Sequence, residues 1–310
     1  MTEPIRHRAP QPAGHPVDPL APSGMSLLLR RVRLIRAGRV PWVAGGLLVL
    51  LVFCALFADL IVPWDPTALN LGKALKPPIW EDGTVPGHFL GTDNLGRDIL
   101  SRIIQGAQVT LEVGLYAIIL SGGIGALMGM VSAYFGGVVD AVIMRLVDIQ
   151  MSIPSIALAL VLAAALNPGM STVIIVIVLS YWTWYARIVR GEVLSLRERD
   201  FVKLARVAGC STPVILWRHI LPNVINTLLV LASLQLGSVI IFEATLSFLG
   251  LGVQSPDMSW GLMLNDARPY MTRAWWPITL PGIAIMIVCL AANVFGDWMR
   301  DTLDPRRRQL

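Results

Sequence analysis

The chain has 310 residues, of which 55% are hydrophobic, and its mean hydropathy is +0.65. Such a composition leaves too little polar surface for a water-soluble globule, so the sequence predicts an integral membrane protein. The formal net charge of +5 does not indicate nucleic-acid binding, because the arginines lie in blocks that flank apolar runs. Arginines in such positions indicate which ends of membrane-spanning segments face the cytoplasm.

Residues 1–40 are predicted to form a disordered, basic cytoplasmic tail. Their Pro-rich beginning cannot bury enough apolar area to order itself. The basic amphipathic stretch that follows is expected to lie on anionic lipid, and it carries Arg30, Arg31, Arg33, Arg36 and Arg39. A secretory signal peptide fits poorly, because the apolar core starts late, is too long and lacks a small-residue cleavage site.

Six apolar runs predict an all-α, polytopic membrane protein with six transmembrane helices. The first run covers 41–62, and the other five lie within a core of 103–299, at 103–135, 138–166, 171–189, 224–249 and 277–299. Lys and Arg gather in the N-terminal tail, near Arg145, in the segment before the fifth run and in the tail 300–310. They are sparse in the outer segments 63–102 and 250–276, so both termini are expected in the cytoplasm of a multi-pass plasma-membrane protein.

Glycines outside the terminal tails indicate two local features. Residues 90–102 combine Gly, Asp and Asn at a density typical of an ordered turn rather than a helix. Gly125 and Gly129 lie four residues apart in an apolar run, which favours close helix packing over a nucleotide-binding loop.

A polar and basic segment at 200–223 separates the fourth and fifth runs and predicts two short helices joined by a tight turn. Gly209 suits the left-handed residue that ends the first helix. Thr212 suits an N-cap and Pro213 the first helical position of the second helix, which Pro222 should end. The pair is either a docking element or a connector that contacts only lipid headgroups.

Few residues indicate chemistry. The chain has no Walker-type nucleotide loop, its four histidines have no ligand spacing, and its three cysteines lie far apart, so no catalytic, cofactor or metal site is expected. Glu112 and Glu243 fall near the outer ends of their runs, and either contact a cationic group of a substrate or form bonds within the protein. Arg145 and Asp148 lie three apart and are expected to form a structural pair or to contact a partner subunit.

The segment 200–223 resembles the EAA loop of ABC-importer permeases, because Ala205, Gly209 and Ile220-Leu221-Pro222 occur at its spacing. Other stretches resemble the C-type permease of dipeptide and oligopeptide importers: HFLGTDNLGRDILSRIIQGAQVTL (88–111), AYFGGVVDAVIMRLVDIQMSIP (133–154), YARIVRGEVLSLRERDFV (185–202), FEATLSFLGLGVQSPDMSWGLML (242–264) and FGDWMRDTLDPR (295–306). One departure is Lys203-Leu204-Ala205, where the family most often has Glu-Ala-Ala.

The resemblance implies a type I importer fold and a set of partners. These are a B-type permease, two ATPases that bind ATP and Mg, an extracytoplasmic substrate-binding protein that contacts 63–100 and 250–276, and a peptide substrate. The residues expected to couple the chain to the ATPases are Lys203, Leu204, Ala205, Gly209, Pro213, Ile220, Leu221 and Pro222. A nickel-chelate or glutathione importer of the same family, a channel or secondary transporter, and a structural scaffold are the alternatives.

Overall fold

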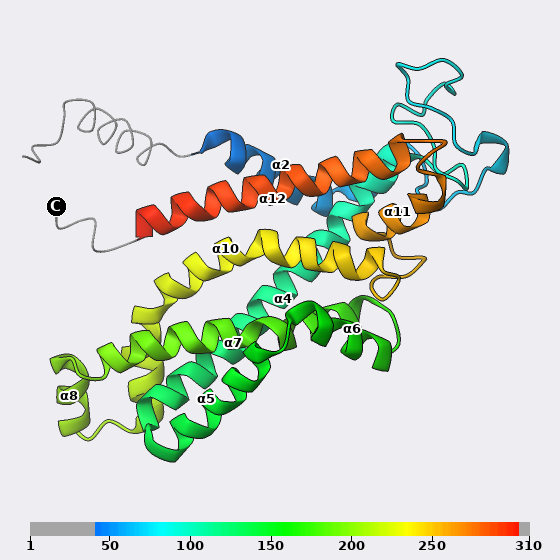
Figure 1. The fold of residues 1–310 in the computed structure, drawn as a ribbon. Helices are drawn as coiled ribbons and strands as arrows, with labels where there is room; N and C mark the ends of the chain where they lie inside the picture. The colour runs from blue at the N-terminus through cyan, green and yellow to red at the C-terminus, as the bar shows by residue number, and fades with distance from the viewer. Residues whose placement is uncertain (1–40, 304–310) are drawn as a thin grey trace, which may run out of the picture. The chain divides into compact units, whose positions relative to one another are not determined.

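The computed structural model describes residues 41–303, and Figure 1 shows their arrangement. The predicted N-terminal tail and the end of the predicted C-terminal tail lie outside the described residues. Within 41–303 every named element is helical, and one isolated bridge joins Thr92 to Asp98. The described part of the chain is therefore all-α, as predicted.

The helices follow one another with few long connections. The first half contains α2 (Trp42–Leu56), α3 (Ala58–Ile61), η1 (Leu71–Lys73), α4 (Ile99–Phe135), α5 (Gly137–Ser152) and α6 (Ser155–Ala165). The second half contains α7 (Met170–Leu196), α8 (Asp200–Val207), α9 (Thr212–Val214), η2 (Ile215–Ile220), α10 (Leu221–Phe248), α11 (Trp260–Ala267), η3 (Arg268–Tyr270) and α12 (Trp276–Leu303).

Among residues 41–303, four stretches are long and apolar enough to cross a membrane: α4, α7, the continuous run from Thr212 to Phe248, and α12. A fifth is present if the bent pair of α5 and α6 is one span. The first predicted run forms the shorter apolar helix α2, and a break at Phe57 separates it from α3. α4 has 37 residues and is about 55 Å long at 1.5 Å per residue. It begins at Ile99, four residues before the predicted start at 103.

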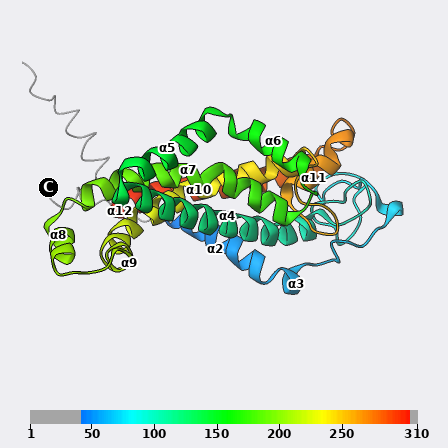
Figure 2. The same ribbon diagram turned by 90° about the horizontal axis from the view of Figure 1, so that it is seen from below.

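α4 packs most extensively on α7, and the two helices run side by side in Figures 1 and 2. A Cβ added to Gly125 would lie 2.5 Å from the Trp182 carbonyl oxygen, and one added to Gly129 would lie 2.6 Å from that of Ala186. The close packing predicted from the spacing of these two glycines is confirmed, because only hydrogen side chains allow the backbones to approach so closely.

The predicted third helix, 138–166, requires a correction. It is divided into α5 and α6, which are bent by 92° at Ile153 and Pro154. Pro154 has no N–H to donate and disfavours a helical conformation at the residue before it, so Ile153 is extended (φ −93°, ψ 129°). Both helices pack against α7 (Figure 2).

Candidate functional site

The segment 200–223, called the connector below, begins with the short helix α8. Its N-cap is Arg199, whose backbone is extended (φ −75°, ψ 149°). Asp200 therefore lies in the first turn, where a negative charge suits the positive helix end. Lys203 pairs with Glu198, which precedes the helix, with 3.5 Å between Nζ and Oε2.

Gly209 ends α8 in the left-handed conformation that the sequence predicts, with φ +79°. The N–H of Gly209 donates to the Arg206 carbonyl and that of Cys210 to the Ala205 carbonyl, both at 3.1 Å. These are the two bonds of a Schellman motif. A Cβ at Gly209 would have no heavy atom within 4 Å, so the backbone conformation, and not crowding, favours glycine here.

The second helix of the connector differs from the prediction at both ends. Ser211 is its N-cap residue, so Thr212 is the first helical residue and Pro213 the second. Pro222 does not end the helix, which continues through the π-helical segment η2 into α10. In η2 the N–H of Leu221 donates to the Leu216 carbonyl five residues back, and this wider turn accommodates a proline that has no N–H.

Buried apolar side chains anchor the connector to the ends of α4 and α7. Val202 and Ala205 of α8, and Ile215 and Ile220 of η2, lie in one hydrophobic cluster. The cluster also contains Leu216 of η2 and residues of the two long helices and the start of α10: Ala126, Met130, Ala133, Val189, Val193, Leu196 and Val224. The connector is therefore packed directly against α4, α7 and α10 in one close-packed cluster.

The opposite face of α8 is apolar and uncovered. Leu204 is 67% exposed, Val207 is 86% exposed, and Phe201 is exposed beside them. Residues three apart share a helix face, so these side chains form one patch, called the α8 patch below. An exposed apolar patch beside charged residues marks an interaction surface.

The predicted coupling residues divide between these two faces. Lys203, Leu204, Gly209, Pro213 and Pro222 are exposed. In contrast, Ala205 and Ile220 are buried anchors, and Leu221 is half-buried. Sequence reasoning missed Phe201 and Val207, although their spacing from Leu204 on one short helix could have revealed the patch.

Charged groups fix the same end of the bundle. Arg190 of α7 forms two hydrogen bonds with the Asp140 carboxylate of α5, at 2.5 and 2.6 Å, and the Ser132 hydroxyl donates to Asp140 Oδ1 at 2.5 Å. Arg197 donates to the Ala133 carbonyl at 2.6 Å, where a cation suits the negative C-terminal end of α4. The contacts hold α5, α4 and α7 together next to the connector.

Asp148 does not pair with Arg145, its predicted partner on the same helix. Its carboxylate instead accepts a hydrogen bond from Arg187 of α7. Asp148 and Arg187 are both exposed, and the pair joins neighbouring helices rather than successive turns of one. The local pair predicted from spacing is therefore wrong, because the adjacent helix offers a closer partner.

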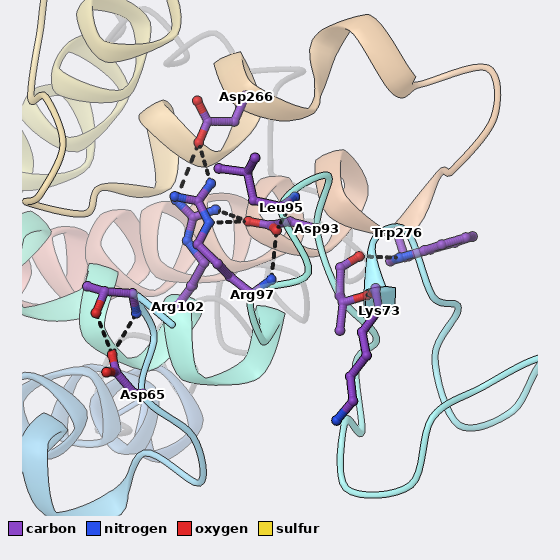
Figure 3. A network of polar contacts seen from close by, with 10 residues as sticks. Asp65, Lys73, Asp93, Leu95, Arg97, Arg102, Asp266 and Trp276 are labelled. Carbon is purple, nitrogen blue, oxygen red and sulfur yellow. Dashed lines mark hydrogen bonds and ion pairs between the residues drawn. The ribbon is translucent and has the colours of Figure 1, made fainter. Parts of the chain in front are cut away.

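At the other end of the bundle, an ion network around the buried Arg102 of α4 ties the segment 63–98 to the half-buried Asp266 of α11 (Figure 3). The Arg102 guanidinium, in a residue only 1% exposed, lies 2.5 Å from Asp93 Oδ2 and 3.4 Å from Asp266 Oδ2. Arg97 contacts the same two carboxylates at 2.7 and 3.0 Å. Residues 90–98 are ordered turns, as predicted, but the last part of the predicted turn, 99–102, is the first turn of α4, which starts at Ile99 with Asp98 as its side-chain cap.

Two tryptophans extend this connection. The Trp276 indole N–H donates to the Thr92 carbonyl at 3.1 Å, and the Trp260 indole N–H donates to the Ile103 carbonyl at 2.9 Å. The two segments predicted to lie outside the membrane are thus joined into one platform by buried contacts.

Glu112 lines a cavity of about 450 Å³ together with Asp59, Asp65 and Asp257. The Gln108 amide donates to its carboxylate at 3.3 Å. The Thr67 hydroxyl and N–H donate to the Asp65 carboxylate and lower its pKa from the ordinary value.

Glu243 is 1% exposed and is not among the residues that line this cavity. The Ser247 hydroxyl donates to Glu243 Oε1 at 2.7 Å and accepts the Val253 N–H at 3.1 Å. The structure therefore does not bring the two predicted glutamates together. Glu243 lies within a local network that holds the segment after α10.

The fold and the connector define a class: a polytopic helical membrane protein with a short helical connector packed on one end of its bundle. The matching family models agree. Residues 123–309 match the model for the binding-protein-dependent transport system inner membrane component, and residues 28–78 match the N-terminal TM domain of oligopeptide transport permease C.

Curated relatives and solved structures are similar over most of the chain. The di/tripeptide transport system permease protein DppC of Pseudomonas aeruginosa is 42% identical over 84% of this chain and 87% of its own length. A putative peptide transport system permease protein of Brucella suis is 41% identical over 95% of this chain and 96% of its own. An inward-facing MetNI methionine ABC transporter structure, with 16% identity and a TM-score of 0.53, covers 66% of this chain and 98% of that chain, so the two share a fold.

The chain therefore belongs to the binding-protein-dependent transport system inner membrane component family, and its N-terminal part matches the C-type permeases within it.

Proposed function

We propose that this chain is one of the two membrane subunits of an ATP-driven importer of dipeptides or oligopeptides, and that the connector receives the force of ATP hydrolysis. The observation that carries the coupling role is the two-faced α8, which buries Val202 and Ala205 against the bundle and exposes the α8 patch. Relatives about 40% identical that are named as peptide transport permeases support the peptide substrate.

The proposed topology has six spans of the type I importer fold: α2 with α3, α4, α5 with α6, α7, α10 and α12. Both termini and the connector would face the cytoplasm. The charge distribution supports this orientation, because the connector and its approach carry Arg190, Arg197, Arg199, Lys203, Arg206 and Arg218.

The partners follow from this topology. Two ATPases would bind ATP and Mg and seat α8 in a groove, and a B-type permease would complete the translocation pathway. The platform formed by residues 63–98 and α11 would receive a substrate-binding protein. Closure of the ATPases would press on Leu204 and Val207, and the buried anchors would pass the motion to α4, α7 and α10.

The decisive experiment is uptake into proteoliposomes that contain this chain, a B-type permease, both ATPases and the binding protein. We expect uptake of a labelled dipeptide that requires ATP. Uptake of a nickel chelate or glutathione in its place would establish the alternative substrate within the family. Uptake by this chain alone, without nucleotide, would establish a channel or secondary transporter and overturn the proposal.

A further inference from the structure

The break between α5 and α6 places irregular backbone beside the middle of a membrane-crossing helix. Gln150, near the end of α5, donates a hydrogen bond to the Leu179 carbonyl, and its Oε1 accepts the Trp182 indole N–H at 2.8 Å. Leu179 and Trp182 lie near the middle of α7. The break is therefore at membrane depth and not at the surface.

Polar backbone at the break lacks the partners of a continuous helix. Pro154 contributes no N–H, and the first N–H groups of α6 have no carbonyl of a preceding turn to bond. Ser152, Pro154 and Ser155 are all exposed. In contact with lipid tails, unpaired backbone groups would cost several kcal/mol each, so such backbone occurs at membrane depth only against protein or water.

A cavity of about 300 Å³ lies at the break, and much of its lining is polar but uncharged. Six of its lining residues are Gln150, Ser152, Pro154, Ser155, Ser180 and Thr183. None of the residues that line it is Asp, Glu, Lys or Arg. At ~30 Å³ per molecule it holds on the order of ten waters. The cavity therefore brings room for water, side-chain hydroxyl and amide groups, and backbone groups without helical partners together at the same depth in the membrane.

We infer that the α5–α6 break lines the water-filled translocation pathway and that its hydroxyl and amide groups hydrogen-bond the uncharged peptide groups of the passing substrate. This inference rests on the proposed function and assigns pathway residues to it. Neutral donors and acceptors suit such a position, because they can replace the water molecules that hydrogen-bond a peptide group. Unlike charged side chains, they do not bind a charged terminus of the peptide so strongly that the peptide is retained.

Cysteine accessibility tests this assignment in the assembled transporter. In a background with Cys54→Ala, Cys210→Ala and Cys289→Ala, we would introduce Ser152→Cys or Ser155→Cys and apply a membrane-impermeant cationic methanethiosulfonate reagent to both sides of the proteoliposomes. Matched controls are Val161→Cys on α6 and Ile175→Cys on α7, two exposed apolar positions. If the chain with all three cysteines replaced does not assemble into the transporter, the buried Cys289 is retained. Its labelling, measured without the introduced cysteine, is then subtracted from the labelling of each variant.

We expect Ser152→Cys and Ser155→Cys to react at least tenfold faster than both controls, and the modification of Ser155→Cys to stop dipeptide uptake. Reaction no faster than the controls would show that lipid or a dry partner helix covers the break, and would overturn the inference. Uptake by the unlabelled background is measured separately, so a transporter that imports no peptide would refute the proposed function whatever the labelling rates.

Discussion

The backbone N–H of Cys210 donates to the Ala205 carbonyl at 3.1 Å and thereby closes the turn that follows α8. Ala205 is buried against the bundle, whereas the neighbouring Leu204 is exposed. The bond therefore joins the anchored face of the connector to the turn that sets the direction of the next helix.

Gly209 controls this turn through its positive φ. Gly209→Val should distort the connector, because a left-handed conformation costs a residue with a Cβ about 1–2 kcal/mol. Gly209→Asn should be tolerated better, since asparagine adopts this conformation more readily. We expect ATP-driven uptake to be lost with Val and largely kept with Asn, at equal membrane levels. Equal uptake by the two variants would contradict the role of the backbone conformation.

The α4–α7 contact provides a second prediction with an internal control. Gly129→Ala places a Cβ 2.6 Å from the Ala186 carbonyl oxygen, whereas Gly123→Ala places one with nothing within 4 Å. Overpacking typically costs about 1–3 kcal/mol. The thermal midpoint of the purified protein should fall with Gly129→Ala and remain near that of the parent with Gly123→Ala. The reverse order would contradict the observed packing.

Two ion pairs between α5 and α7 should contribute unequally. Arg190→Ala removes two hydrogen bonds to a carboxylate, at about 1.5–3 kcal/mol for a hydrogen bond to a charged group. Arg187→Ala removes an exposed pair with Asp148, and such pairs contribute about 0–1 kcal/mol. Thermal unfolding of both variants in detergent should show the larger decrease for Arg190→Ala. Similar decreases would show that the Asp140 network is no stronger than a surface pair.

The buried guanidinium of Arg102 gives a fourth prediction. Replacing Arg102 and Arg97 together with methionine leaves Asp93 and Asp266 without either cation, and breaking a buried pair such as Arg102 with Asp93 costs about 3–5 kcal/mol. Segment 63–98 should then detach from α11 and become susceptible to protease in the folded protein. Arg268→Met is the control, because the side chain of this exposed arginine lies over the Phe248 ring, away from Asp93 and Asp266. Equal protease resistance of both variants would contradict the tethering role.

Two prolines show what could be predicted from the sequence and what could not. Pro154 was expected inside a continuous helix and breaks it, whereas Pro222 was expected to end a helix and does not. A proline without an N–H is accommodated when the preceding turn widens, as η2 does, and otherwise the residue before it becomes extended. Which of these occurs depends on neighbouring helices, which the local sequence does not specify.

Features that depend on adjacent residues were more predictable. The left-handed Gly209 and the close packing at Gly125 and Gly129 follow from backbone geometry and spacing. The partner of Asp148 and the separate environments of Glu112 and Glu243 depend on tertiary contacts, which spacing along one helix does not predict.

The α8 patch tests the central claim most directly, through co-purification of the ATPase subunits with this chain. Replacing Leu204 and Val207 together with alanine should weaken ATPase binding at least about tenfold, because burial of each such side chain contributes about 1.5–3 kcal/mol. The control replaces Leu69 and Leu71, two exposed leucines in the segment 63–98 at the other end of the bundle, and should leave ATPase binding unchanged. Unaltered ATPase binding by the Leu204 and Val207 variant would contradict a docking role for α8.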